Sequence, residues 1–175
     1  MAIRLRTPRL LLREWRDEDV APFGAMSADP ALTEFLLPPD KDWVARARRR
    51  WGEHGFGQFV VELPGEATFI GVVGLGDLHA TAPAAPAIEA AWRLARPYWG
   101  MGYAVEAARA AIDDGFFRLG LDEIVAITVV ANRRSRRVME RLGMTRDPAE
   151  DFDFAHPRLP KGHPLRRHVL YRARR

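Results

Sequence analysis

The sequence contains no cysteine. This absence excludes disulfide bonds, thiolate metal ligands and a catalytic cysteine that carries an acyl group. It is typical of cytoplasmic proteins, so a cytoplasmic location is expected. Long apolar runs are also missing, which argues against a membrane span. The first residues, MAIRLRTPRLLLREW, lack the apolar segment and the small-residue cleavage site of a signal peptide, and no contact with a membrane is expected.

Lysine is nearly absent too, since only Lys41 and Lys161 are found, and the excess positive charge is carried by arginine. The net charge is +4 and the sequence pI is about 10.1. The planar guanidinium group suits phosphate, which favours a nucleic acid or a phosphate-bearing cofactor as partner. The excess is modest and aromatic–basic repeats are missing, so the cofactor is preferred. The segments RARRR and RRSRR leave a nucleic-acid module as an alternative, whose binding would weaken steeply with salt.

With 175 residues, of which 47% are hydrophobic, the chain has the size of one domain with a sizeable core. A single domain over residues 1–175 is predicted. Periodicity and turn residues predict an α/β (α+β mixed) architecture, with a mixed sheet flanked by helices. Strands are expected over residues 9–15, twice within 57–78 around a Pro64–Gly65 turn, over 87–95 and 122–130, and twice in the tail. Helices are expected over residues 16–29, 42–54, 102–120 and 132–143, with a loop over 80–87.

Two glycines stand directly before a predicted helix in the segment RPYWGMGYAVEA, residues 96–107. The start of a helix exposes unpaired N–H groups and the positive end of the helix dipole, so a start without a blocking side chain favours an anion. Glycine also lets the backbone approach a ligand closely. Taken alone, the glycines fit a plain strand-to-helix turn as well. A dinucleotide-binding turn is excluded, because the third glycine and the later acidic residue are missing.

The order of strand, glycine turn, helix, buried strand, asparagine and short helix resembles the GNAT superfamily of acetyl-CoA-dependent N-acetyltransferases. It is most similar to the ribosomal-protein N-terminal acetyltransferases, the Rim-type enzymes. The resemblance covers nearly the whole chain, through TPRLLLREWRDEDV, FIGVVGL, PYWGMGYAVEA and ANRRSRRVMERLGM. The superfamily pattern Gln/Arg-x-x-Gly-x-Gly/Ala falls on residues 99–104, with Trp99 at its first position as in the Rim-type branch. The resemblance implies the GNAT fold, a mostly antiparallel mixed sheet with a splayed strand pair flanked by helices.

The resemblance also implies acetyl-CoA (coenzyme A) as cofactor. The N–H groups of residues 101–104 would bind its pyrophosphate, the preceding strand would offer main-chain groups to its pantetheine arm, and Asn132 would bond the pantetheine region. Two alternatives remain: Asn132 or Ser135 caps the following helix, and the arginines of residues 133–137 form a solvated face. The side chains of Trp92 and Leu94 are expected in the core. The cofactor-binding residues implied are Ala91, Trp92, Arg93, Leu94, Trp99, Gly100, Met101, Gly102, Tyr103, Ala104, Asn132, Arg134 and Ser135.

For catalysis, the absence of cysteine favours direct attack of the amine within a ternary complex. Glu89 matches an acidic position of the superfamily and is the expected base, acting through water; a surface glutamate is the alternative. Many superfamily members protonate the leaving sulfur with a tyrosine, but Met139 stands at that place. The Rim-type branch uses the serine instead, so the resemblance implies that Ser135 hydrogen-bonds the leaving sulfur.

The acceptor is expected to be a primary amine, either a protein N-terminus or a small molecule. A non-catalytic acyl-CoA sensor on the same fold is the alternative, and a homodimer is possible. The histidines match no zinc spacing, so no metal is expected. By the resemblance, the tail loops and the first two helices form the acceptor wall, which gives as candidates Trp43, Trp51, Phe56, His156 and His168.

Overall fold

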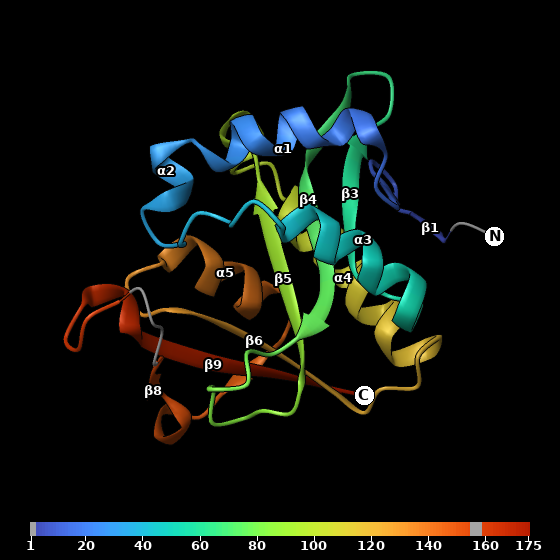
Figure 1. The fold of residues 1–175 in the computed structure, drawn as a ribbon. Coiled ribbons are helices and arrows are strands. Elements are labelled where there is room, and N and C mark those ends of the chain that lie inside the picture. Colours follow the sequence, from blue (N-terminus) through green and yellow to red (C-terminus); the bar gives the residue numbers. More distant parts are fainter. Residues whose placement is uncertain (1–2, 155–158) are drawn as a thin grey trace.

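A computed structural model describes residues 3–154 and 159–175 of the chain, which form one nine-stranded sheet with helices on both faces (Figure 1). The sheet order is β1-β2-β3-β4-β5-β6-β9-β7, and β8 pairs with β9. Neighbouring strands are antiparallel except β5 and β6, which are parallel. The strands are β1 (Arg4–Arg6), β2 (Leu11–Arg13), β3 (Gln58–Leu63), β4 (Ala67–Asp77), β5 (Ile88–Leu94), β6 (Glu123–Val129), β7 (Thr145–Arg146), β8 (Phe152–Asp153) and β9 (Arg167–Arg174).

Two helix ends carry capping residues that the sequence supplies. Asp29 accepts a hydrogen bond from the Ala31 N–H at 2.8 Å and so caps the short helix α2, and Gly55, with φ of +68°, ends α3. The α-helices are α1 (Val20–Ser27), α2 (Pro30–Thr33), α3 (Trp43–His54), α4 (Tyr103–Phe117) and α5 (Arg133–Arg141). Short 3₁₀ helices cover Asp17–Asp19, Arg96–Tyr98, Pro148–Glu150 and Pro164–Arg166.

The parallel strands β5 and β6, which α4 connects, diverge almost at once. They share a single registered pair, Glu89 with Val125, whereas β4 and β5 pair along seven positions from Gly71–Leu94 to Asp77–Ile88. The predicted splayed pair in a mostly antiparallel sheet is therefore confirmed. The Ile/Val run of β6 is buried on both faces, as expected for a strand beneath a crossover helix.

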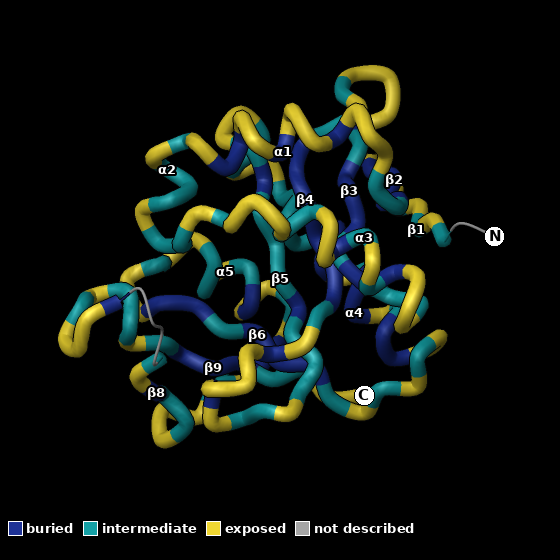
Figure 2. The backbone as a smooth tube through the Cα atoms, viewed as in Figure 1, coloured by how far each residue is buried: buried dark blue, intermediate teal, exposed yellow. Residues whose placement is uncertain are grey.

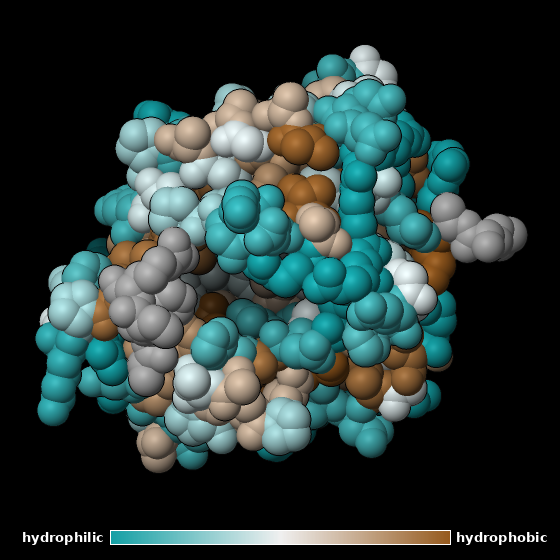
Figure 3. All heavy atoms as spheres, viewed as in Figure 1, coloured by the Kyte–Doolittle hydropathy of each residue, from teal (hydrophilic) through white to brown (hydrophobic). Residues whose placement is uncertain are grey.

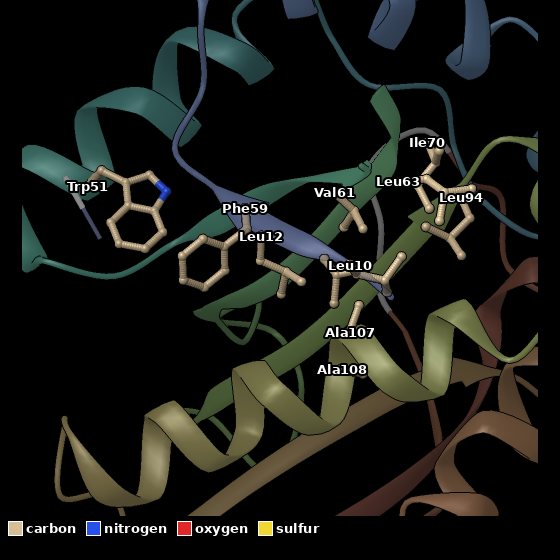
Figure 4. Close-up of a cluster of buried hydrophobic side chains, with 11 residues drawn as sticks. Leu10, Leu12, Trp51, Phe59, Val61, Leu63, Ile70, Leu94, Ala107 and Ala108 are labelled. Carbon is tan, nitrogen blue, oxygen red and sulfur yellow. The ribbon is translucent and has the colours of Figure 1, made fainter. Parts of the chain in front are cut away.

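The core lies on both faces of the central strands, because successive side chains of a strand point to opposite sides. Val61 of β3 shares one buried cluster with Ala107 and Ala108 of α4 (Figure 4). Its neighbour Val60 shares another cluster with Phe23 of α1. Figure 2 shows the buried backbone gathered in the central strands, with exposed segments on the outer helices and loops.

One buried cluster is ionic rather than apolar and consists of Arg13, Asp19 and Glu62. Arg13 is 3% exposed and donates to the two carboxylate oxygens of Asp19 at 2.7 and 2.8 Å and to Glu62. Its remaining donors reach the carbonyl oxygens of Glu14 and Thr68 at 3.0 Å. Every nitrogen of this guanidinium is therefore satisfied inside the protein, which joins β2 to β3 and to the turn before α1.

The helices and strands predicted from the sequence are confirmed, with differences at the edges of the sheet. β1 and the short helix α2 were not predicted, and the tail holds three strands, β7, β8 and β9, rather than two. The predicted helix over residues 16–29 opens with a 3₁₀ turn, and α4 ends at Phe117, three residues before the predicted stop at Gly120. Strands this short leave no alternation of apolar and polar residues for a sequence to reveal.

Within residues 3–154 and 159–175, no helix combines the length and apolar character needed to cross a membrane. The same stretches contain no group of three or more His, Asp or Glu side chains that could hold a metal ion. His79 and His168 instead pack on the ring of Phe154, and their ring centroids lie 5.0 Å and 5.2 Å, respectively, from the Phe154 centroid. These two histidines belong to an aromatic cluster on the β8–β9 side of the sheet.

Candidate active site

The divergence of β5 and β6 opens one wall of a cavity of about 1160 Å³. Its other walls come from the turn before α4, from α3, from α5 and from residues 31–36. This volume is at the upper end of what small-molecule sites need, so the cavity can hold a cofactor and an acceptor together. On the face viewed in Figure 3, strongly hydrophilic side chains gather over α3.

The turn before α4, residues 99–102, leaves the helix start bare. Gly100 and Gly102 have φ of +79° and +82°, values that favour glycine, and no side chain in the described part of the chain caps α4. The N–H groups of residues 103–105 have no acceptor among the described residues. Trp99 fixes the turn, since its Nε1–H donates to the Leu94 carbonyl at 2.7 Å. The result is a fixed set of N–H donors at the positive end of a 15-residue helix.

The N-terminal segment holds this helix start through Glu106, which lies in the first turn of α4. The Glu106 carboxylate accepts hydrogen bonds from the Thr7 hydroxyl at 2.6 Å, from the Arg9 N–H at 2.9 Å and from the Arg9 Nε at 2.7 Å. Burial opposes its ionisation, but these hydrogen bonds hold the pKa of Glu106 below its usual value. Arg9 also donates to the Met101 carbonyl at 2.9 Å, so one side chain ties the helix to the turn.

A second group of cavity residues comes from the start of α5. Asn132 accepts the Ser135 N–H at 3.1 Å, so Asn132 caps α5, which was the alternative interpretation of this residue. Both residues also line the cavity. The guanidinium of Arg134 lies 4.6 Å from the centre of the Trp99 ring, which joins α5 to the turn before α4 across the cavity.

Glu89 and Arg93 are the ionisable residues that β5 contributes to the cavity. They lie on the face of β5 opposite to Ala90 and Leu94, which are buried in the core. Burial raises the pKa of Glu89 from its ordinary value of 4.5 to about 7, and the charge of Arg93 opposes only part of this shift. Glu89 is therefore not the surface glutamate of the alternative interpretation, but a carboxyl group that titrates near neutral pH.

The structure brings most of the residues singled out in the sequence to this one cavity. The lining includes Trp43, Glu89, Ala91, Trp92, Arg93, Leu94, Trp99, Gly100, Gly102, Tyr103, Ala104, Asn132, Arg134 and Ser135. Met101 is the exception in the turn: its side chain is 52% exposed and lies outside the lining. The expected core role is confirmed for Leu94, whereas Trp92 is only partly buried.

Three acceptor-wall candidates need correction, because the structure does not bring them to the cavity. Trp51 is in the hydrophobic core, where its ring packs on Phe59 with centroids 4.7 Å apart (Figure 4). Phe56 lies under the guanidinium of Arg50 at 4.4 Å, beside a core cluster, and His168 stacks on Phe152. His156 falls outside the described residues. The sequence prediction missed Arg9 and Glu106, as well as the cavity-lining arginines Arg46, Arg49 and Arg50 of α3.

Comparison with known proteins decides the family. Residues 9–145 match the model of the acetyltransferase (GNAT) domain. This chain belongs to the GNAT acetyltransferase family. It is 32% identical over 147 residues to YkkB of Bacillus subtilis, an alignment that covers 81% of this chain and 84% of that one. As a family member it is an acetyl-CoA-dependent acyltransferase.

Solved GNAT structures show the same fold over almost the whole length of this acetyltransferase. An acetyltransferase from Agrobacterium tumefaciens superimposes with a TM-score of 0.78 at 28% identity, covering 99% of this chain and 95% of that one. The ribosomal-protein-S5-alanine acetyltransferase from Vibrio fischeri superimposes with a TM-score of 0.74 at 19% identity, covering 98% and 96%. The second likeness shows a shared fold with the ribosomal-protein branch that the sequence resembles.

The Arg9–Glu106 contact predicts an effect on cofactor affinity. In this acetyltransferase, Arg9→Gln is expected to weaken CoA binding about tenfold, because a charge-assisted bond that orders the turn before α4 is lost. Isothermal titration calorimetry with CoA measures the change. Arg6→Gln is the matched control, since Arg6 is an exposed arginine of β1. Equal CoA affinity of the Arg9 and Arg6 variants would contradict the assigned role.

Proposed function

We propose that this acetyltransferase transfers the acetyl group of acetyl-CoA to a primary amine by direct attack within a ternary complex. One observation carries the proposal: the uncapped start of α4 and the Glu89 carboxyl group, whose pKa is about 7, line the same cavity. The first suits the pyrophosphate of the cofactor, and the second suits proton removal from an amine. The chain has no cysteine to carry the acetyl group, which is in keeping with direct transfer.

The residues present fit the cofactor along the splayed strands. The free N–H groups at the start of α4 would bind the pyrophosphate, and Gly100 has open space where a Cβ would stand, so the backbone is accessible there. Ala91 and Leu94 of β5 would offer main-chain groups to the pantetheine arm in the space that β6 leaves open. Arg134 would leave the Trp99 ring to meet a phosphate.

Two side chains would move or hold protons during transfer. Ionised Glu89 would take the proton that the amine loses as its C–N bond to the acetyl carbon forms, directly or through a water molecule. The hydroxyl of Ser135 would donate a hydrogen bond to the sulfur as the C–S bond breaks. The products would be an N-acetylated amine and free CoA thiol. Glu89 would release its proton to solvent, and the leaving sulfur would take one up from solvent.

The test is transfer of label from [¹⁴C]acetyl-CoA to a panel of N-terminal peptides, amino acids, polyamines and aminoglycosides. Label in an acceptor amine supports the enzyme. Tight CoA binding without label in any amine would overturn the proposed transfer and leave a CoA-binding sensor on the same fold.

The cofactor position has its own prediction. Gly100→Ala is expected to lower CoA affinity about tenfold or more, because a methyl group intrudes where the backbone should meet the pyrophosphate. Gly65→Ala is the matched control: Gly65 has φ of +83°, close to the +79° of Gly100, and also has open space around it, but it lies in the β3–β4 turn. Calorimetry with CoA compares the two. Similar affinities would mean that the pyrophosphate lies elsewhere.

A further inference from the structure

Arg93 is held in the wall of the cavity on the face of β5 that it shares with Glu89. Its neighbours Trp92 and Leu94 point to the other face, toward the core clusters under α4. The guanidinium carbon lies 5.5 Å from the centre of the Trp43 ring of α3. Arg93 therefore lies between β5 and α3 in the cavity wall.

This guanidinium makes no hydrogen bond or ion pair in the described part of the chain, and Glu89 acts on it through charge alone. The hydrogen bonds and ion pairs of residues 3–154 and 159–175 include none from Arg93. Burial lowers its pKa, and only the charge of Glu89 acts in the opposite direction. A partly buried guanidinium without a hydrogen-bonded carboxylate is costly, so its place in a cavity wall indicates a site for an incoming anion.

The neighbouring arginines show that the lack of a partner is specific to this position. Arg46 makes two hydrogen bonds to Asp40, both 2.9 Å, and Arg50 makes two to Asp77. Both side chains line the same cavity from α3. Arg49, the third arginine of α3 in the lining, is 60% exposed and lies 3.7 Å from Glu53, so Arg93 is the one cavity-lining arginine of β5 and α3 without an ion pair among the described residues.

We infer that the acceptor carries a carboxylate in addition to its amine, and that Arg93 binds this carboxylate. The inference rests on the proposed acetyl transfer. Guanidinium and carboxylate match as planar groups with two parallel hydrogen bonds, which gives orientation as well as affinity. The acceptor lies along β5 with its amine at Glu89 and its carboxylate at Arg93. Four strand positions separate the two residues, about 13 Å between Cα atoms.

The same arrangement disfavours acceptors that carry a second positive charge. A diamine or polyamine that places one amine at Glu89 would bring its other ammonium group toward Arg93 and the arginines of α3. Like charges in a partly buried cavity repel strongly. The arginine-rich wall is therefore selective against polyamines as well as selective for anionic amines.

Kinetics with matched acceptors test this inference. The probes are ω-amino acids of increasing length, from glycine to 6-aminohexanoate, the corresponding carboxamides, and diamines of equal length. For the preferred length, wild-type kcat/KM is expected to favour the carboxylate over the carboxamide at least tenfold. Arg93→Gln is expected to reduce this preference to about twofold or less. Arg48→Gln, which removes an arginine of α3 that pairs with Asp17 and lies outside the cavity lining, is expected to keep it.

A binding measurement separates this inference from the proposed transfer. Titration of each ω-amino acid and its amide into the CoA-loaded protein shows whether the carboxylate is selected, even if no acetyl group moves. Selective binding that Arg93→Gln abolishes supports the anion site, with or without turnover. Equal binding of acid and amide by wild type, preference for diamines, or an unchanged preference in Arg93→Gln would overturn it. Absence of transfer alone would overturn only the proposed function.

Discussion

Replacing Glu89 with glutamine is expected to lower kcat about 100- to 10,000-fold, which is the usual contribution of a general base. The amide keeps the size of the side chain but cannot accept the proton that the amine must lose. Affinity for CoA, measured by calorimetry, is expected to stay within about twofold, because the proposed pyrophosphate contacts come from the turn before α4. The comparison of kcat with CoA affinity distinguishes loss of chemistry from loss of cofactor.

The pKa of Glu89 also predicts the direction in which kcat changes with pH. Burial raises the pKa of Glu89 to about 7, so the base is protonated and inactive below this pH and ionised above it. Wild-type kcat is expected to rise with pH through about 7 and then level off. Because the amine substrate titrates equally in both assays, the ratio of wild-type to Glu89→Gln activity shows the titration of Glu89 alone. A ratio that stays constant from pH 5.5 to 8.5 would exclude Glu89 as the base.

The same shift has a consequence for stability that turnover does not influence. A carboxyl group whose pKa is higher in the folded state stabilises the fold fully below its unfolded value of 4.5, and this contribution is lost as pH rises through about 7. The free energy of unfolding of Glu89→Gln, relative to that of wild type, is therefore expected to increase as the pH rises. Denaturation at pH 5 and pH 8 measures the gain.

The second large effect concerns the buried ionic cluster. Arg13→Met is expected to lower the free energy of unfolding by about 3–5 kcal/mol, because Asp19 and Glu62 then remain in the interior without their cation. Urea denaturation followed by circular dichroism measures the loss.

Arg16→Gln is the matched control for this cluster. Arg16 also reaches Glu62, at 3.2 Å, but its side chain is 47% exposed, so the expected loss is below about 1 kcal/mol. An equal decrease in the free energy of unfolding of the two variants would contradict the prediction that the buried Arg13 stabilises the fold more than the exposed Arg16.

Much of the fold could be predicted because its central elements carry strong local patterns. The Ile/Val run of β6, the Pro64–Gly65 turn between β3 and β4 and the periodic apolar positions of α4 each specify their own conformation within a few residues. β1, β7 and β8 differ in this respect. Each is only two or three residues long and is defined by the strand that it pairs with, so their conformations depend on contacts that the local sequence does not encode.

The same distinction applies to the site. The turn of residues 99–102 and the start of α5 are contiguous motifs, and the structure places both at the cavity. Arg9 and Glu106 lie 97 positions apart, and neither is unusual in its own segment. Trp43 and Trp51 show a further limit: both belong to α3, but Trp43 faces the cavity and Trp51 the core, which depends on how the helix packs on the sheet.

Two of the five tryptophans each lie against a guanidinium at a different part of the cavity, Trp43 by Arg93 and Trp99 by Arg134. A ligand that draws either cation away alters the surroundings of one indole and leaves the other as it was. In variants that keep Trp99 or Trp43 as the single tryptophan, emission is expected to change with CoA in the first and with the acceptor in the second. Such a pair of variants would give the order of binding without an added label.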